Sequence, residues 1–463
     1  MKARKLITLL VTCLMVGTLA GCGSNNSGDA ETNAPATENT EKTETAEKQV
    51  LKIAGLEGGY GTEHWKKLEE SFETANPDVD VQLTLASNLE EVLRPQIQAG
   101  NVPDIIYLAT GRADALTETF INEQALHDLS NVLDMTVPGE SVKVRDKILP
   151  GFLDTSATNP YGDGKSYLAP LFYSPTGLFY DKNLFETKGY EVPTTWDEFF
   201  ALGDKAKADG IYLFTYPTAG YLDSMVPAML AAAGGIDTFN KAMSYEEGFW
   251  TSPEATKVLE TVAKLKDYIE PSVVANANSD GGFKTNQQLI LDDKALFCPN
   301  GTWLPGEMAD APRAEGFEWG FAAYPAFENG GDTYSYNFFE QMYIPKDAAN
   351  IELAEKFMAY IYSDEAVEII AQYGTAAVVP TVGSMEIAKK YLDDLNVEML
   401  SVYDNGAKPV MGGFAATEPV EGLDWKNTYV GMVDSVMNGT KTVEDWQNQL
   451  VSDSDKLRAA IIK

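Results

Sequence analysis

Hydrophobic residues recur along the first part of the chain with the two periods that distinguish strands from helices. Residues 50–56 form a short apolar run and residues 79–85 alternate between apolar and polar, so both segments are predicted to be strands. Between them, Trp65, Leu68 and Phe72 stand at positions i, i+3 and i+7 and therefore share one face of a helix. The pattern predicts a strand, a helix and a second strand in that order.

The same order continues for one more repeat. Residues 88–99 have a helical pattern, and residues 102–108 are predicted to be a buried strand. A β-α-β-α-β order is typical of a parallel sheet covered by helices. Ligands of such sheets bind beyond the carboxyl ends of the strands. A binding site is therefore expected at the loops that follow the strands.

Segment 165–186 is rich in strand-favouring residues and is interrupted by Pro170 and Pro175. Proline lacks the backbone N–H that a strand donates to its neighbour, and it restricts the residue before it, so the two prolines argue against one central strand. We predict instead that the chain leaves one folded unit here and enters another. With 463 residues and 44% hydrophobic content, the chain is long enough for two units.

Later segments of the chain carry further structural signals. Thr195, followed three residues later by Glu198, predicts a helix that begins with a capping box. Residues 334–343 predict a second strand that crosses between the two units. Residues 351–363 predict an amphipathic helix that returns to the first unit, and residues 375–381 predict a third connection.

The chain begins with a basic segment followed by the apolar residues 6–19, a run too short to cross a membrane as a helix. This arrangement is typical of a secretory signal peptide, predicted over residues 1–21. The sequence Leu-Ala-Gly-Cys that ends at Cys22 resembles the bacterial lipobox, which implies cleavage before Cys22 and a diacylglyceryl group on its sulfur. The alternative is an ordinary signal peptide that contains a cysteine. Residues 22–49 lack aromatic and large aliphatic side chains and are predicted to be a disordered stalk.

The formal net charge of -34 makes the protein repel nucleic acid and anionic lipid surfaces. We therefore expect no nucleic-acid partner, and a neutral or cationic ligand is favoured. The sequence contains two histidines, His64 and His127, and its three cysteines are dispersed. This composition argues against a His-rich metal site and against a Ser-His-Asp triad. Cys298 is predicted to be a small buried hydrophobe.

Several local motifs resemble those of one protein family. They are Asn-Pro-Asp-Val within residues 75–79, Gly-Asn-Val-Pro-Asp-Ile at residues 100–105 and Pro-Thr-Thr-Trp-Asp-Glu at residues 193–198. Together with segment 165–186, they are similar to motifs of extracellular solute-binding protein family 1, the maltose-binding-like receptors of sugar ABC importers. Within this family, residues 299–308 resemble the receptors for chitooligosaccharides and N-acetylglucosamine.

The resemblance implies an α/β fold of two lobes, the type II periplasmic-binding-protein fold, in which each lobe is a mainly parallel sheet flanked by helices. Lobe one would consist of residues 50–170 and 340–385, and lobe two of residues 176–335 and 386–463. The crossing segments that join the lobes would lie at residues 171–175 and 334–340.

The resemblance also implies a function. The protein would be a substrate-binding lipoprotein of a carbohydrate ABC importer, anchored outside the cytoplasm to the cell membrane through Cys22. As a monomer without a cofactor or a metal, it would capture an oligosaccharide between its lobes and deliver it to the permease, and it would not be an enzyme. Two other functions stay open from the sequence: a secreted glycosidase, which needs two carboxyl groups about 5 to 10 Å apart, and a surface adhesin.

Sugars present hydroxyl groups around an apolar ring face, so a sugar site needs flat aromatic rings to stack on that face and planar polar groups to bind the hydroxyls. For Trp303 and Trp425, packing in the core is the alternative to a binding role, and for Arg112 it is pairing with a neighbouring carboxylate. The positions that match the family's site give these ligand-binding candidates: Tyr60, Arg112, Tyr173, Tyr221, Asp223, Trp303, Glu340 and Trp425.

Overall fold

The computed structural model describes residues 48–461, except residues 59, 113, 154, 375–384 and 416. The chain divides into two units, Met1–Ala46 and Glu47–Lys463, and all the described residues belong to the second. The predicted signal peptide, Cys22, nearly all of the predicted stalk and the predicted third connection at residues 375–381 therefore lie outside the described residues. Within the described part of the chain, no helix is both long and apolar enough to cross a membrane.

The first third of the chain forms the predicted α/β arrangement. Strand β1 (Gln49–Leu56) pairs in parallel with β2 (Val79–Ala86) and with β3 (Ile105–Tyr107). Helix α1 (Glu63–Ala75) connects β1 to β2, and α2 (Leu89–Gln98) connects β2 to β3. The predicted β-α-β-α-β order is confirmed, and the first strand begins at Gln49.

The first hydrophobic core, called core one, lies between this sheet and its covering helices. The predicted inner face of α1 is buried, since Trp65 and Leu68 are 0% exposed. The Phe72 ring on the same face contacts Phe357 of α14 (Ile351–Ile361), with 4.9 Å between the ring centroids. The other helices of this region are α3 (Leu116–Asn122), α4 (Ser130–Asp134), α5 (Val144–Lys147), α15 (Asp364–Tyr373) and α16 (Met385–Ala388).

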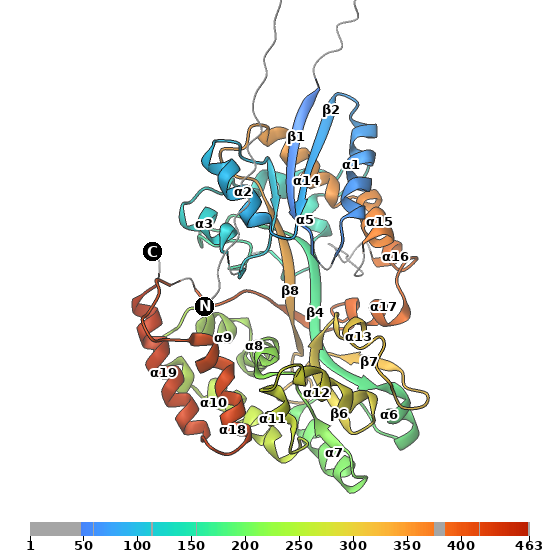
Figure 1. The fold of residues 1–463 in the computed structure, drawn as a ribbon, viewed down its shortest axis with the longest axis vertical. Helices are drawn as coiled ribbons and strands as arrows, with labels where there is room; N and C mark the ends of the chain where they lie inside the picture. Colours follow the sequence, from blue (N-terminus) through green and yellow to red (C-terminus); the bar gives the residue numbers. More distant parts are fainter. Residues whose placement is uncertain are drawn as a thin grey trace, which may run out of the picture. The chain divides into compact units, whose positions relative to one another are not determined.

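Two long strands, β4 (Ala169–Asp181) and β8 (Tyr334–Tyr343), lie side by side and antiparallel in the middle of the sheet (Figure 1). Both were predicted as segments that cross between folded units. The prediction that the prolines prevent a single strand is wrong, because β4 contains both of them. Pro170 adjoins an irregularity in the pairing with β8. Pro175 is the last β4 residue paired with β8, and Thr176 is the first paired with the next strand, so each missing N–H falls where the ladder is interrupted.

The second half of the sheet differs from the mainly parallel arrangement that was predicted for each lobe. Strands β6 (Ala295–Gly301) and β7 (Trp319–Ala322) both pair with β4 in antiparallel orientation. Parallel pairing is found between β5 (Tyr212–Phe214) and β6, and between β8 and the short strand β9 (Lys408–Val410). Strands β6 and β7 run opposite to β4, so the parallel order of the first half of the sheet does not continue here. The full order is β2-β1-β3-β8-β4-β6-β5, with β7 on β4 and β9 on β8.

The second main core, called core two, lies beneath the helices of this half. Thr195 and Glu198 form the predicted capping box at the start of α7 (Trp196–Ala208). Cys298 is fully buried with a free thiol, as predicted. The other helices are α6 (Lys182–Lys188), α8 (Leu222–Gly234), α9 (Ile236–Met243), α10 (Pro253–Lys264), α11 (Val273–Ala277), α12 (Gly282–Leu291), α13 (Leu304–Glu307), α17 (Asp394–Leu400), α18 (Met432–Met437) and α19 (Val443–Ala459).

Residues after position 384 contribute to more than one core. Met385 and Leu400 pack with core one, whereas Val430 and Trp446 pack with core two. The predicted lobe boundaries stay a prediction.

Candidate ligand-binding site

The middle of β8 exposes an aromatic ring beside a carboxylate. Side chains alternate between the two faces of a strand, so Tyr336, Phe338 and Glu340 share one face. Their partners on β4 include Ser174, opposite Phe338, and Phe172, opposite Glu340. The Phe338 side chain is 39% exposed, although its neighbour Asn337 is 1% exposed. An aromatic side chain that faces solvent from a central strand is available for binding.

Four rings form a continuous group, here called the aromatic surface: Tyr221, Trp303, Tyr336 and Phe338. The centroid of the Trp303 ring lies 5.7 Å from that of Phe338 and 6.4 Å from that of Tyr221. The Tyr336 ring lies 5.1 Å from the Phe338 ring, and the Tyr336 hydroxyl donates to the Gly412 carbonyl at 2.8 Å. Trp303 and Tyr221 are both partly exposed. The aromatic surface therefore combines candidates predicted from the sequence with two rings that were not.

Trp303 is held at the end of β6 by the backbone beneath it. A Cβ atom on Gly301 would lie 2.2 Å from the indole ring, so only glycine lets the ring lie this close to the backbone. The intervening Thr302 hydroxyl is hydrogen-bonded to the Ser174 hydroxyl of β4. The ring thus has a fixed position at the carboxyl end of a strand, where ligands of α/β sheets bind.

Glu340 is a buried carboxyl with an incomplete set of partners. Burial raises the pKa of Glu340 to about 7, and the nearby positive charge of Arg112 opposes this rise. Its Oε2 atom is buried and accepts no hydrogen bond from the described residues. Tyr60 and Tyr107 lie close enough for the charge of Glu340 to raise their pKa values further than burial alone does. Perturbed groups with unused hydrogen-bonding capacity are typical of functional sites.

The raised pKa of Glu340 predicts a pH-dependent loss of stability. The unfolded chain has an ordinary carboxyl pKa of about 4.5, so the contribution of Glu340 to stability is fully present below that pH and is lost as the pH rises through about 7. Glu340→Gln should therefore raise the melting temperature by a few degrees at pH 8 and change it little at pH 4.5. Thermal unfolding at both pH values measures this. Glu328→Gln, at a side chain that is 81% exposed, is the control; an equal effect of both changes would contradict the assignment.

Arg112 and Tyr60 flank this carboxyl on the side of core one. Arg112 makes a two-pronged ion pair with Glu90, with Nη2 donating to Oε2 at 3.3 Å. Pairing with a neighbouring carboxylate, the alternative role considered for Arg112, is thus observed. The positive charge of Arg112 nevertheless also lowers the pKa of Glu340. The Tyr60 ring contacts Phe172, with 5.2 Å between the centroids.

Asp223 and Trp425 lie on the side of core two. Burial raises the pKa of Asp223 to about 6, and Lys426 opposes this rise. Trp425 stacks almost parallel to Tyr429, with centroids 6.0 Å apart, and its Nε1 atom is buried without an acceptor among the described residues. The charge of Asp223 also raises the pKa of Tyr429, so Asp223 lies near this second group of rings.

Tyr173 is placed away from these groups. It neighbours Phe172 in β4 and therefore points to the opposite face of the sheet. Its side chain is 3% exposed, and its hydroxyl donates to the Leu400 carbonyl at 3.3 Å. For this reason, Tyr173 does not belong to the proposed ligand set.

Phe338 and Tyr336 were not predicted as ligand-binding residues, although the alternation of residues along the strand indicated them. Residues 334–340 read Tyr-Ser-Tyr-Asn-Phe-Phe-Glu, in which Tyr336 and Phe338 stand four and two residues before Glu340. A strand with Glu340 at the site must present these two rings on the same face. The alternation was sufficient to find them once 334–343 had been predicted as a strand.

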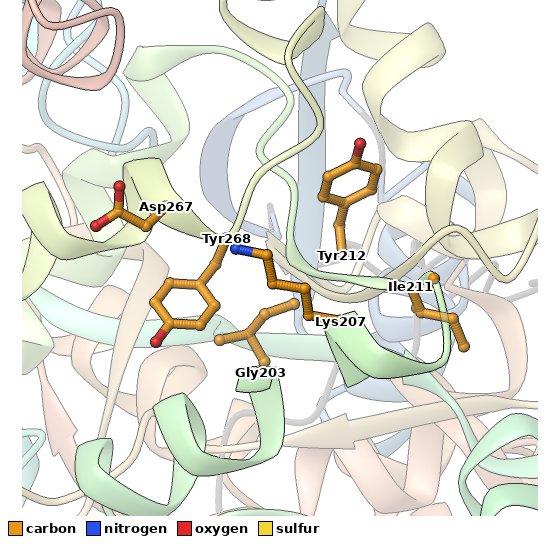
Figure 2. Close-up of a pocket in the computed structure, with 8 residues that line it drawn as sticks. Gly203, Lys207, Ile211, Tyr212, Asp267 and Tyr268 are labelled. Atoms are coloured by element: carbon orange, nitrogen blue, oxygen red, sulfur yellow. The ribbon is translucent and has the colours of Figure 1, made fainter. Parts of the chain in front are cut away.

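Two of the cavities in the described part of the chain lie elsewhere and contain none of the eight candidates. The larger has a volume of about 1270 Å³ and is lined by residues of 149–162, by the α9 region and by residues of 403–415. The smaller, of about 190 Å³, lies between α7 and β5, and Figure 2 shows Lys207, Tyr212 and Tyr268 among its lining residues. Neither cavity presents a partly exposed tryptophan, so the aromatic surface is the better sugar site.

Comparison with known proteins matches the chain to one family and to several solved structures. A family model described as bacterial extracellular solute-binding protein matches residues 67–398. The diacetylchitobiose binding protein of Streptomyces coelicolor is 27% identical over 315 residues, which is 66% of this chain and 64% of the relative, less than two thirds of its length. The multiple sugar-binding protein of Streptococcus mutans is 24% identical over 317 residues, 65% of this chain and 69% of the relative.

The solved structures that resemble this chain include a bacterial solute receptor described as having an exclusive preference for β-D-galactopyranose. It superposes with a TM-score of 0.65 at 20% identity, covering 89% of this chain and 98% of the receptor. A Listeria monocytogenes ABC substrate-binding protein in complex with cycloalternan superposes with a TM-score of 0.59 at 20% identity, covering 89% of this chain and 100% of the other. These likenesses show that the fold is the predicted two-lobed α/β fold of solute-binding proteins.

Proposed function

The chain belongs to the bacterial extracellular solute-binding protein family, and from this we propose that it binds an oligosaccharide and delivers it to the permease of a carbohydrate ABC importer. The observation that carries the proposal is the partly exposed Trp303 ring beside Phe338, close to the buried Glu340 carboxylate. The rings can stack on the apolar face of a sugar, and the free Oε2 atom can accept a hydrogen bond from a hydroxyl or an amide.

We infer further that the ligand is neutral and of the chitooligosaccharide or N-acetylglucosamine type. The named ligand of the Streptomyces relative supports this class, as does the resemblance of residues 299–308. The site contains two carboxyl groups, Glu340 and Asp223, and burial raises the pKa of both, so the surroundings of both groups disfavour a negative charge. An acidic sugar such as a uronic acid would bring such a charge into the same surroundings, which favours a neutral ligand.

The decisive experiment is a calorimetric screen of residues 48–463 against neutral and acidic glycans, combined with an assay for new reducing ends. Binding without turnover supports the proposed receptor. Cleavage that is abolished by a single Asp or Glu substitution would establish a glycosidase instead. An adhesin that recognises a protein would bind none of the small glycans.

We also propose that the protein is a lipoprotein held at the outer face of the cell membrane through Cys22. The Leu-Ala-Gly-Cys sequence supports this, and two acyl chains give a firm attachment where one is marginal. Cys22→Ser should shift the full chain from the membrane fraction to the soluble one, or leave it unprocessed. An unchanged membrane fraction with a normally processed N-terminus would contradict lipidation.

A further inference from the structure

The Phe338 ring occupies a position that the core does not require. At this level β8 is already paired with β4, since Phe338 stands opposite Ser174. The ring nevertheless remains 39% exposed, whereas the nearby β4 residues Ser174 and Thr176 are 3% and 0% exposed. Leaving a large aromatic group in water at the centre of a sheet is unfavourable. The exposed side of the ring is therefore available to a ligand.

The orientation of Phe338 relative to Trp303 limits what that can be. Their ring planes are inclined by 56° and their centroids are 5.7 Å apart. A pyranose ring that lies flat on one of the two planes cannot lie flat on the other. Stacking on both requires two sugar rings whose mean planes differ, such as consecutive rings turned about a glycosidic bond.

Polar groups on the same face of β8 agree with this geometry. Glu340 stands two residues from Phe338, and its Oε2 atom has no donor among the described residues. A sugar stacked on Phe338 carries hydroxyl groups around its edge, and these can donate hydrogen bonds to Oε2 of Glu340. Trp303 on the other side is anchored to the end of β6 and is adjacent to Tyr221. The two rings thus adjoin different groups, which suits two different sugar rings of one glycan.

We propose that Phe338 is a specificity-determining residue that binds a second sugar ring, so that the site selects glycans of at least two rings. This rests on the proposed function, because Trp303 must bind the first ring. The wild-type protein should bind a disaccharide at least about tenfold more tightly than its monosaccharide, since one added stacking contact is worth about this factor.

Calorimetry tests the proposal with three pairs of ligands, each a monosaccharide and a disaccharide of that sugar. The first pair is N-acetylglucosamine and N,N′-diacetylchitobiose, and the other two are the corresponding pairs for glucose and galactose. Phe338→Ala should weaken disaccharide binding about tenfold and change monosaccharide binding by less than about twofold, which removes most of the preference. Phe338→Tyr, which keeps the ring, should retain the preference. Tyr212→Ala serves as the matched control, because Tyr212 is a similarly exposed aromatic residue (37%) in the small cavity of Figure 2. Melting temperatures establish that each variant is folded.

The outcomes separate this inference from the function on which it rests. If the wild type binds mono- and disaccharides equally well, or if Phe338→Ala weakens both to the same extent, the second-ring role is wrong while the receptor function stands. If the wild type binds no glycan of the panel, the proposed function and the inference both fail. If Phe338→Ala does not fold, retention of the preference in Phe338→Tyr and its loss in Phe338→Leu decide the question.

Discussion

Trp303→Ala should weaken glycan binding by about tenfold to a hundredfold and leave the melting temperature nearly unchanged. The indole is partly exposed and lies against the backbone of Gly301 and the ring of Phe338, so its removal empties no closed core site. A tryptophan that stacks on a ligand is a typical centre of binding energy, and its loss is expected to remove about 1–3 kcal/mol. Calorimetry with the best glycan of the panel measures the change.

Intrinsic fluorescence gives an independent check on Trp303. Glycan addition should change the emission of the parent protein and change that of Trp303→Ala less. Trp425→Ala is an informative companion, because Trp425 lies among Phe414, Tyr245 and Tyr429 on the side of core two. A large drop in melting temperature with unchanged affinity would assign Trp303 to the fold and remove it from the site.

Trp446→Ala should have the opposite pattern, a loss of about 3–5 kcal/mol of unfolding free energy. Trp446 lies on α19, is 0% exposed and packs in core two, and its Nε1 atom donates to the Thr428 carbonyl at 3.1 Å. The substitution removes the buried ring and also leaves that carbonyl without its donor. Chemical denaturation of the glycan-free protein measures the loss.

Trp446→Phe separates the two contributions to this loss. Phenylalanine fills most of the volume but lacks the N–H, so it should lower the unfolding free energy by clearly less than alanine does. Glycan affinity of the folded fraction should remain close to that of the parent in both variants, because Trp446 lies within core two rather than on the aromatic surface. A stability equal to that of the parent in Trp446→Ala would show that the site collapses without a cavity.

The order of helices and strands could be predicted because it follows from local patterns. The inner face of α1 and the capping box of α7 need no information beyond a few neighbouring residues. The continuity of β4 through two prolines could not be predicted in this way. Its explanation is that β4 changes partners between Pro175 and Thr176, and which strands flank which residue is fixed by contacts far apart in the sequence.

The candidate site shows the same limit for single side chains. In the sequence, Trp303, Trp425 and Trp446 all stand near polar residues, yet the structure places them differently. Trp303 lies on the aromatic surface, Trp425 at the margin of core two and Trp446 inside core two. Tyr173 and Phe172 are adjacent, but the pairing of β4 with β8 puts Phe172 opposite Glu340 and directs Tyr173 to the other face. The family resemblance indicated which positions to consider as site residues. The face of the sheet to which each of these side chains points follows only from the register of the strands.

The central position of β4 and β8 in the sheet also has a consequence expected for folding. Core one contains Leu51 near the start and Met411 far along the chain, and core two extends from Leu178 to Leu450. Neither core is complete until most of the polypeptide is present, and contacts between such distant residues form slowly because a long loop must close first. We therefore expect a chain that emerges gradually from the ribosome to complete either core only late in its synthesis. The topology that joins the two halves is thus also expected to delay the completion of folding until most of the chain is available.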